Sequence, residues 1–396
     1  MAVLAAALFV SVGCASHRSQ LPSTDLARAK LSELVDSEAA RRLLADLLER
    51  QSRGPRLAAA APTALDADDG GARAESATDR AALLDQARLR TLALEVSMDY
   101  AALAFARALG ADEWSRAVQE TFDRALRDGV GHSEEVLRRP GAFPYTVLFA
   151  PAWLYHSHPE SGADFARQRQ VLDRLGIPHR LIPSAESASV EENAEIIATA
   201  VREATRDESN KLIVVSDSKS GAEVALALSR LLSPKETASV AAWINLAGAL
   251  RGTPLADSGL RPPISWVVGA LFWLTGHDLA GPASMTTTRS RARLDGARIP
   301  SSVAIVNLVA VPVSGTVGLN VYGGYKVLSR HGPNDGVVLL ADTVWPGGAN
   351  IVALGADHLL GPLQDDAHAL AMLRAAEVAL RLHRVRSSVE ESSFTR

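Results

Sequence analysis

A serine that follows an apolar run is the residue of this sequence best placed for chemistry. Residues 212–215 are apolar, five small or polar residues follow, and an alanine-rich helical pattern begins at Gly221. This order is typical of a strand, a sharp turn and a helix, with Ser218 at the apex of the turn. Such a serine can attack a carbonyl carbon once a base takes its proton. Ser216 and Ser220 are rival nucleophiles, and a turn without chemistry is the structural alternative.

A histidine and an aspartate later in the chain could complete the chemistry. His358 follows the apolar segment 350–354, and Asp335 stands between Asn334 and Gly336 in a turn-forming sequence. An imidazole can take the proton of the serine, and a carboxylate can orient and stabilise that imidazole. Each residue alone could be an ordinary loop residue. The chain order serine, aspartate, histidine, with each residue after an expected strand, favours a triad of Ser218, Asp335 and His358.

Two other aspartates compete for the role of the acid. Asp357 is adjacent to His358 in the sequence, and Asp342 follows Asp335 by a few residues. Adjacent loop side chains usually diverge, so Asp335 is preferred to Asp357, and Asp342 is the weaker alternative.

The elements that must position these residues alternate between strands and helices after about residue 144. A capping box, with Ser189 and Glu192 three residues apart, opens one of the helices. This alternation predicts an α/β fold with a mostly parallel sheet covered by helices on both faces, whose ligands bind at the carboxyl ends of the strands. The expected strands cover residues 145–151, 179–182, 211–215, 239–248, 301–311 and 350–354, and the expected helices cover residues 163–175, 189–206, 221–232 and 365–384.

The first third of the chain differs from the rest in composition and in the spacing of its apolar residues. Residues 24–51 and 79–128 have apolar residues at helical spacing, whereas residues 52–77 are rich in Ala, Gly, Asp and Arg. We therefore expect a helical accessory region at 15–140, with a flexible linker at about 52–77, before a catalytic domain at 141–396.

The chain resembles the α/β-hydrolase superfamily, and within it the bacterial lipases and esterases, over roughly residues 144–384. The resemblance is carried by VLFAPAWLY at 147–155, by Ser216 to Gly221, by the stretch GTPLAD at 252–257, and by the loops NDG at 334–336 and ADH at 356–358. It implies the α/β-hydrolase fold, with Ser218, Asp335 and His358 as nucleophile, acid and base.

The resemblance also implies an oxyanion hole made of two backbone N–H groups. One belongs to Lys219, the residue after the nucleophile, and the other to Ala152 or Trp153 in the loop after the first strong strand. The sequence departs from the family where serines replace both glycines of the usual G-x-S-x-G motif, and where Ala152 replaces a common glycine.

A cap over the site is expected at about 258–295, between two strands. Residues 263–279 are apolar on all sides and carry Trp266, Phe272 and Trp273, but the run is too short to span a bilayer. The functional interpretation is a lid that lines an acyl pocket or touches lipid, and the structural alternative is a buried core helix.

The N-terminus resembles a bacterial lipoprotein signal that ends at Cys14. Residues 1–13 are mostly apolar, and small residues surround the cysteine. The segment departs from such signals in two ways: no Lys or Arg precedes the apolar run, and Ser11 stands where Leu is usual. A lipid on Cys14 would anchor an exported protein to a bacterial membrane without a spanning helix. A signal without lipidation and an ordinary apolar N-terminus are the alternatives.

Composition excludes several classes of function. The net charge is −4 and no aromatic RNA-binding motif is present, so nothing indicates a nucleic-acid partner. Phosphate-loop and dinucleotide motifs are absent, so no cofactor is expected. His156 and His158 have a spacing that can bind zinc, but they lack a partner set, and we expect no metal.

The sequence thus predicts a membrane-anchored serine hydrolase acting on a small-molecule or lipid carboxylic ester, with an apolar acyl group. A catalytically inactive binding protein on the same scaffold and an acyltransferase that uses the same triad are the alternatives.

Overall fold

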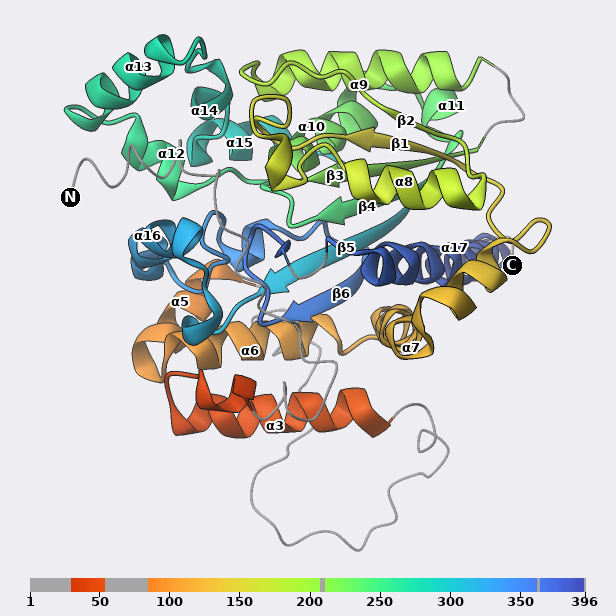
Figure 1. The fold of residues 1–396 in the computed structure, drawn as a ribbon, viewed down its shortest axis with the longest axis horizontal. Coiled ribbons are helices and arrows are strands. Elements are labelled where there is room, and N and C mark those ends of the chain that lie inside the picture. The colour runs from red at the N-terminus through yellow and green to blue at the C-terminus, as the bar shows by residue number, and fades with distance from the viewer. Residues whose placement is uncertain (1–29, 54–84, 207–210, 362–363, 395–396) are drawn as a thin grey trace, which may run out of the picture.

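The computed structural model of the chain describes residues 30–53, 85–206, 211–361 and 364–394. A six-stranded sheet with the order β2-β1-β3-β4-β5-β6 crosses the molecule, and all of its strands are parallel (Figure 1). The strands are β1 (Thr146–Ala150), β2 (His179–Leu181), β3 (Leu212–Asp217), β4 (Val240–Leu246), β5 (Ala304–Val311) and β6 (Ala349–Leu354). The predicted α/β-hydrolase fold is confirmed, because parallel strands alternate with helices in this order.

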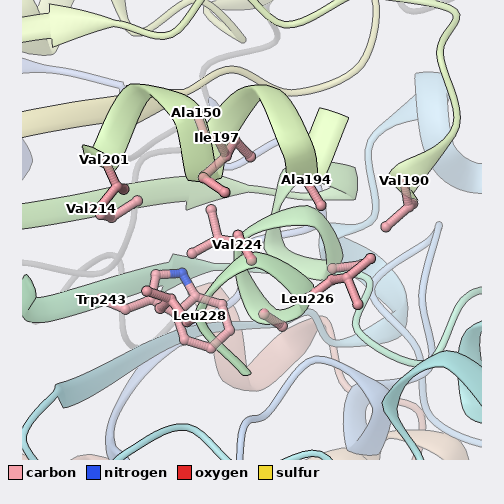
Figure 2. Close-up of a cluster of buried hydrophobic side chains, with 14 of the residues drawn as sticks. Ala150, Val190, Ala194, Ile197, Val201, Val214, Val224, Leu226, Leu228 and Trp243 are labelled. Atoms are coloured by element: carbon pink, nitrogen blue, oxygen red, sulfur yellow. The ribbon is translucent and has the colours of Figure 1, made fainter. Parts of the chain in front are cut away.

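One face of the sheet is covered by α9 (Val190–Ala204) and α10 (Lys219–Leu226). Alternate residues of a strand point to opposite faces, and Val214 and Trp243 point to this one. Figure 2 shows both side chains in one apolar cluster with Val224 of α10. This packing fixes the start of α10, which follows the turn that carries Ser218.

The opposite face packs against α8 (Ala166–Leu175) and α17 (Asp366–Phe394). Phe149, Val215 and Ile244 point to this face, one residue out of step with those of the first face. Burial on both faces explains why the central strands are continuous apolar runs. α17 extends ten residues beyond the predicted end at 384.

The N-terminal helices cover the end of the sheet at β5 and β6. They are α3 (Glu38–Arg53), α5 (Gln86–Glu95), α6 (Met98–Leu109) and α7 (Glu113–Leu137). α7 packs on α17 and β6, while α3 and α6 share an apolar cluster with residues of β5 and β6 (Figure 1). The helical region therefore covers the sheet directly. The predicted linker lies, from residue 54, outside the described residues, as do the signal segment and Cys14.

A buried aspartate joins this N-terminal region to the loop after β5. Asp99 Oδ2 accepts hydrogen bonds from the Asp36 amide (2.8 Å) and from Ser314 Oγ (2.8 Å), and its Oδ1 accepts one from the Ser314 amide (2.8 Å). Burial raises the pKa of Asp99 to about 6, despite the bonds from Ser314 that favour its charged form. The carboxyl group thus holds three segments of the chain together.

A row of buried asparagines crosses the sheet at three paired positions. Asn245 Nδ2 donates to Asn307 Oδ1 (3.1 Å), and Asn307 Nδ2 donates to Asn350 Oδ1 (3.1 Å). Asn350 Nδ2 then donates to Ser115 Oγ of α7 (3.2 Å). Buried polar groups usually have hydrogen-bond partners, and each amide Nδ2 of the row finds an acceptor, whereas Asn245 Oδ1 has no partner among the described residues. The row ties α7 to the sheet through Ser115.

Helices α12 (Pro254–Gly259), α13 (Ile264–Leu274), α14 (Ala280–Ser284) and α15 (Thr287–Leu294) lie between β4 and β5, where the cap was predicted. Arg289 and Arg293 of α15 both bond to Glu191 of α9. The shorter α11 (Pro234–Thr237) precedes β4, and α16 (Leu319–Leu328) follows β5. Within the described ranges, no helix is both long and apolar enough to span a bilayer.

Candidate active site

Ser218 occupies a sharp turn between β3 and α10. Its backbone has φ 56° and ψ −120°, a conformation that costs energy for any residue with a side chain. The Ser218 amide donates to the Leu246 carbonyl (3.0 Å), and its carbonyl accepts from the amides of Gly221 (3.1 Å) and Ala249 (2.9 Å). The strained backbone is therefore held by three hydrogen bonds, and the turn presents the serine at the carboxyl end of the sheet.

The two rival serines have structural partners instead. Ser216 is fully buried and its Oγ accepts a hydrogen bond from Trp243 Nε1 (2.8 Å). Ser220 is fully buried, and its Oγ donates to the Ala150 carbonyl (2.7 Å) and accepts from the Asp217 amide (2.9 Å). The hydrogen bonds of Ser216 and Ser220 therefore stabilise the turn. Of the three serines, Ser218 alone bonds to His358.

In the usual motif, glycines allow the backbone at the nucleophile turn to approach the neighbouring chain closely. Here Gly221 and Gly248 allow such an approach. A Cβ added to Gly221 would lie 2.7 Å from the Gly248 Cα and 2.8 Å from Asn245 Oδ1. Real Cβ atoms do not come so near, so the start of α10 packs against the end of β4 only because residue 221 lacks a side chain. The close approach thus lies one position after Ser220, and the serines at 216 and 220 are instead held by their own hydrogen bonds.

The structure brings Ser218, His358 and Asp335 together in one hydrogen-bonded chain. Ser218 Oγ lies 2.8 Å from His358 Nε2, and His358 Nδ1 lies 2.8 Å from Asp335 Oδ2. The His358 amide also donates to the Asp335 carbonyl (2.9 Å). This arrangement can activate a serine hydroxyl, because Nε2 faces the hydroxyl while the carboxylate holds the opposite nitrogen.

Asp335 is fixed by its own loop. It is fully buried, and its Oδ1 accepts hydrogen bonds from the amides of Val337 (2.9 Å) and Val338 (2.7 Å). The remaining oxygen is therefore directed to His358. Such a carboxylate orients the imidazole without reorganisation during the reaction.

Several charges act on the protonation of His358. Burial alone would lower its pKa, but the charge and the hydrogen bond of Asp335, with smaller contributions from Asp217 and Asp357, raise the pKa above its ordinary value. The carboxylates therefore stabilise the imidazolium that would form when Ser218 gives up its proton.

The side chains of the rival acids Asp357 and Asp342 bond to groups other than the imidazole ring of His358. Asp357 Oδ2 accepts from the Gly318 amide (2.9 Å), and its Oδ1 accepts from the Leu359 amide (3.1 Å). Asp342 Oδ1 lies 3.9 Å from an Arg251 guanidinium nitrogen, and Asp342 Oδ2 lies 3.9 Å from one of Arg291. Burial raises the pKa of Asp342 to about 6. Asp357 shapes the loop of His358, and Asp342 belongs to a separate cluster of charges.

The predicted oxyanion donors differ in whether their backbone N–H groups are already bonded. Lys219 is the first residue of α10, where a helical N–H has no carbonyl one turn earlier to bond. The Ala152 amide, in contrast, donates to the Ala163 carbonyl (3.0 Å), so Ala152 does not supply the second donor in this arrangement. The assignment of Trp153 stays a prediction.

The three cap aromatics do not line a common pocket. Phe272 is 3% exposed and stacks on Trp153 at a ring distance of 5.7 Å. Trp266 and Trp273 are 72% and 78% exposed. The expectation of a shared acyl pocket is therefore wrong for the two tryptophans. The buried-helix alternative is also wrong, because α13 buries mainly Val268 and Phe272.

The two histidines considered for zinc lie near carboxylates. His158 Nδ1 is 3.0 Å from Glu160 Oε1, and the His156 amide bonds to Glu186. In the part of the chain that the structure describes, no three His, Cys, Asp or Glu side chains gather where a metal ion could bind.

Sequence reasoning missed two carboxylates beside the nucleophile. Glu223 is buried one helical turn after Lys219, bonds to its ammonium group, and accepts from Asn193 Nδ2 (2.9 Å). The four-residue spacing of Lys219 and Glu223 was a signal for this pair. The second carboxylate is Asp217, whose Oδ1 is buried with no hydrogen-bond partner among the described residues.

Comparisons with known proteins find solved structures of low sequence identity. No protein-family model and no curated protein matches the chain. The metagenomic carboxyl esterase MGS0156 is 21% identical with a TM-score of 0.48, over 59% of this chain and 75% of its own. The mature Bacillus licheniformis lipase BlEst2 is 21% identical with a TM-score of 0.45, over 55% of this chain and 86% of its own. Phospholipase PlaB from Legionella pneumophila is 15% identical with a TM-score of 0.33, over 50% and 45% of the two chains.

Proposed function

We propose that this protein is a serine hydrolase that cleaves carboxylic esters through an acyl-enzyme. The observation that carries the proposal is the hydrogen-bonded chain from Ser218 through His358 to Asp335, built on a strained turn at the carboxyl end of the sheet. Solved carboxyl esterases and lipases resemble the chain and agree with this class of reaction.

The proposed reaction has two halves. In the first, His358 takes the proton of Ser218 as the hydroxyl oxygen attacks the ester carbonyl, and the Lys219 amide stabilises the oxyanion. His358 then gives the proton to the alcohol oxygen, and the alcohol leaves. In the second half, His358 activates water, which releases the acid and restores Ser218.

Hydrolysis of p-nitrophenyl butanoate by the wild type and by Ser218→Ala tests the proposal. The variant is expected to lose about 10³-fold or more in kcat, since removing a triad member leaves only the contributions of binding and of the oxyanion hole. A well-folded wild type that does not accelerate hydrolysis of any ester would instead support a non-catalytic binding protein. Accumulation of a new ester when an alcohol is added would identify an acyltransferase.

We also propose that the protein is held at a bacterial membrane by a lipid on Cys14, with an apolar acyl group in its substrate. The apolar run that ends at Cys14 supports the anchor. The exposed Trp266 and Trp273 of α13 would then face a lipid surface, because tryptophan favours the boundary between water and lipid.

A further inference from the structure

A cavity of about 80 Å³ lies between the sheet and helices α8 and α17. Its walls are mostly apolar, with Phe149 and Phe165 on one side and Met372 of α17 on the other. A cavity needs about 10–15 Å³ to hold one water-sized group, so this cavity has room for several such groups. Its lining includes Val147, near the start of β1, and Asp217, at the end of β3.

One end of this cavity lies beside the triad. Asp217 directly precedes Ser218, and Leu360, which also lines the cavity, follows His358 by two residues. Burial raises the pKa of Asp217 to about 6, and the charges of His358 and Asp335 act on it as well, so the carboxyl group is near both residues. The end of the cavity lined by Asp217 and Leu360 is therefore the part closest to the triad, and the remainder is lined by the apolar interior.

The carboxyl group at this end is incompletely bonded. Asp217 Oδ1 is buried and has no hydrogen-bond partner within the described part of the chain. Two other polar side chains of the lining have partners: Gln364 Nε2 donates to the Ser161 carbonyl (2.9 Å), and His368 Nδ1 lies 2.7 Å from Asp365 Oδ1. A buried acceptor without a partner costs free energy that a donor from a ligand would recover.

The reaction itself indicates which part of an ester would enter. His358 gives its proton to the oxygen of the leaving alcohol, so the alcohol must lie on the His358 side of Ser218. The lining residues of the cavity nearest in sequence to Ser218 and His358 are Asp217 and Leu360. The acyl group, in contrast, stays on Ser218 when the alcohol departs.

We infer that this cavity binds the alcohol part of the ester, and that Asp217 selects alcohols with a hydrogen-bond donor close to the ester oxygen and an apolar tail beyond it. The donor bonds to Asp217 Oδ1, and the tail runs along the aromatic wall. A hydroxyl and an ammonium group could both serve as the donor. This inference rests on the proposed ester hydrolysis, and it makes Asp217 a specificity-determining residue.

A set of butanoate esters tests the inference while the acyl-enzyme stays the same. The alcohols are hexanol, 3-hydroxyhexanol and 3-(dimethylamino)hexanol, and methyl butanoate serves as a reference that does not reach the cavity. Acid release gives kcat/KM, which reports acylation. We expect kcat/KM for at least one donor-bearing ester to be about ten-fold higher than for hexyl butanoate, which is the effect of one hydrogen bond to a charged acceptor. Equal values for the three hexyl esters in the wild type would overturn the inference.

Two substitutions of Asp217 identify the donor. Each kcat/KM of a variant is divided by the kcat/KM of the same variant for methyl butanoate. On this scale, Asp217→Leu is expected to lose the preference for donor-bearing esters over hexyl butanoate. Asp217→Asn is expected to keep a preference for the hydroxyl, because its amide oxygen still accepts, and to lose one for the ammonium. A preference that survives in Asp217→Leu would refute the role of this residue.

A substitution on the far wall tests the path of the tail. Ala369→Phe, on the α17 side of the cavity, is expected to lower kcat/KM for hexyl butanoate about ten-fold relative to methyl butanoate. An unchanged ratio in a variant that melts like the wild type would show that the tail lies elsewhere. If methyl butanoate itself is not hydrolysed by the wild type, the proposed function fails, and not only this subsite.

Discussion

Replacing Asp335 by asparagine keeps the size of the side chain and removes its charge. In the wild type, Oδ1 accepts from the amides of Val337 and Val338, while Oδ2 faces His358 Nδ1 at 2.8 Å. The new amide oxygen is best used by the two backbone N–H groups, which leaves the NH₂ group toward Nδ1. His358 would then carry its proton on Nε2, where it cannot accept the proton of Ser218.

The loss of activity follows from this change of tautomer and from the loss of the charge opposite the imidazolium. We expect kcat/KM to fall by about 10³- to 10⁴-fold, the effect of the equivalent change in other serine triads. This corresponds to about 4–5.5 kcal/mol of transition-state free energy. Binding of the ester should change little, since Asp335 is buried behind His358.

The pH profile of kcat/KM gives an independent check. The wild-type rate should rise with pH as His358 loses its proton, with a midpoint above the ordinary histidine pKa, because Asp335 raises that pKa against the effect of burial. In Asp335→Asn the burial remains and the charge is gone, so the midpoint should move to lower pH.

Asp357→Asn is the matched control, because Asp357 is adjacent to His358 in sequence but bonds to the Gly318 and Leu359 amides. We expect it to lose less than about ten-fold in kcat/KM. A large loss in Asp357→Asn with a small loss in Asp335→Asn would refute the assignment of the acid.

Four further predictions concern stability and location. Gly221→Ala should lower the free energy of unfolding by about 2–3 kcal/mol in urea denaturation, because its Cβ would lie 2.7 Å from the Gly248 Cα; wild-type stability would contradict the proposed close approach. Ser220→Gly restores a glycine of the usual motif, yet should cost about 1–3 kcal/mol by the same measurement, because two hydrogen bonds of its hydroxyl are lost; a gain in stability would show that the serine is tolerated rather than useful. Asp99 has a folded pKa of about 6 against 3.8 unfolded, so the folded state binds the extra proton and the stability advantage of the wild type over Asp99→Ala should grow by about 1 kcal/mol from pH 7 to pH 5; a constant or shrinking advantage would count against the raised pKa. Cys14→Ala should move the protein from the membrane fraction to the soluble fraction of expressing cells, and unchanged fractionation would exclude the lipid anchor.

The sequence was informative where one pattern has one structural meaning. Continuous apolar runs bounded by turn residues located the parallel strands, because a strand buried on both faces cannot carry exposed polar residues. The order of Ser218, Asp335 and His358 could be read for a related reason, since each follows a strand and the carboxyl ends of parallel strands meet at one edge.

Other features depend on contacts between segments that no local pattern encodes. The asparagine row of β4, β5 and β6 exists only because three strands align in register, and each asparagine alone interrupts an apolar run. The α13 helix was expected either to be a buried core helix or to be a lid that lines an acyl pocket or touches lipid, and only one side of it packs against neighbouring residues. The amide of Ala152 is engaged by Ala163, eleven residues later, across a loop whose path is set by tertiary packing.

The most direct test of the central claim is covalent labelling with a fluorophosphonate probe, which reacts with an activated serine and needs no knowledge of the substrate. The wild type should be labelled, whereas Ser218→Ala and His358→Ala, each shown to be folded by its thermal melting, should not. Labelling that persists in Ser218→Ala, or none in the folded wild type, would contradict the assignment of Ser218 as the nucleophile.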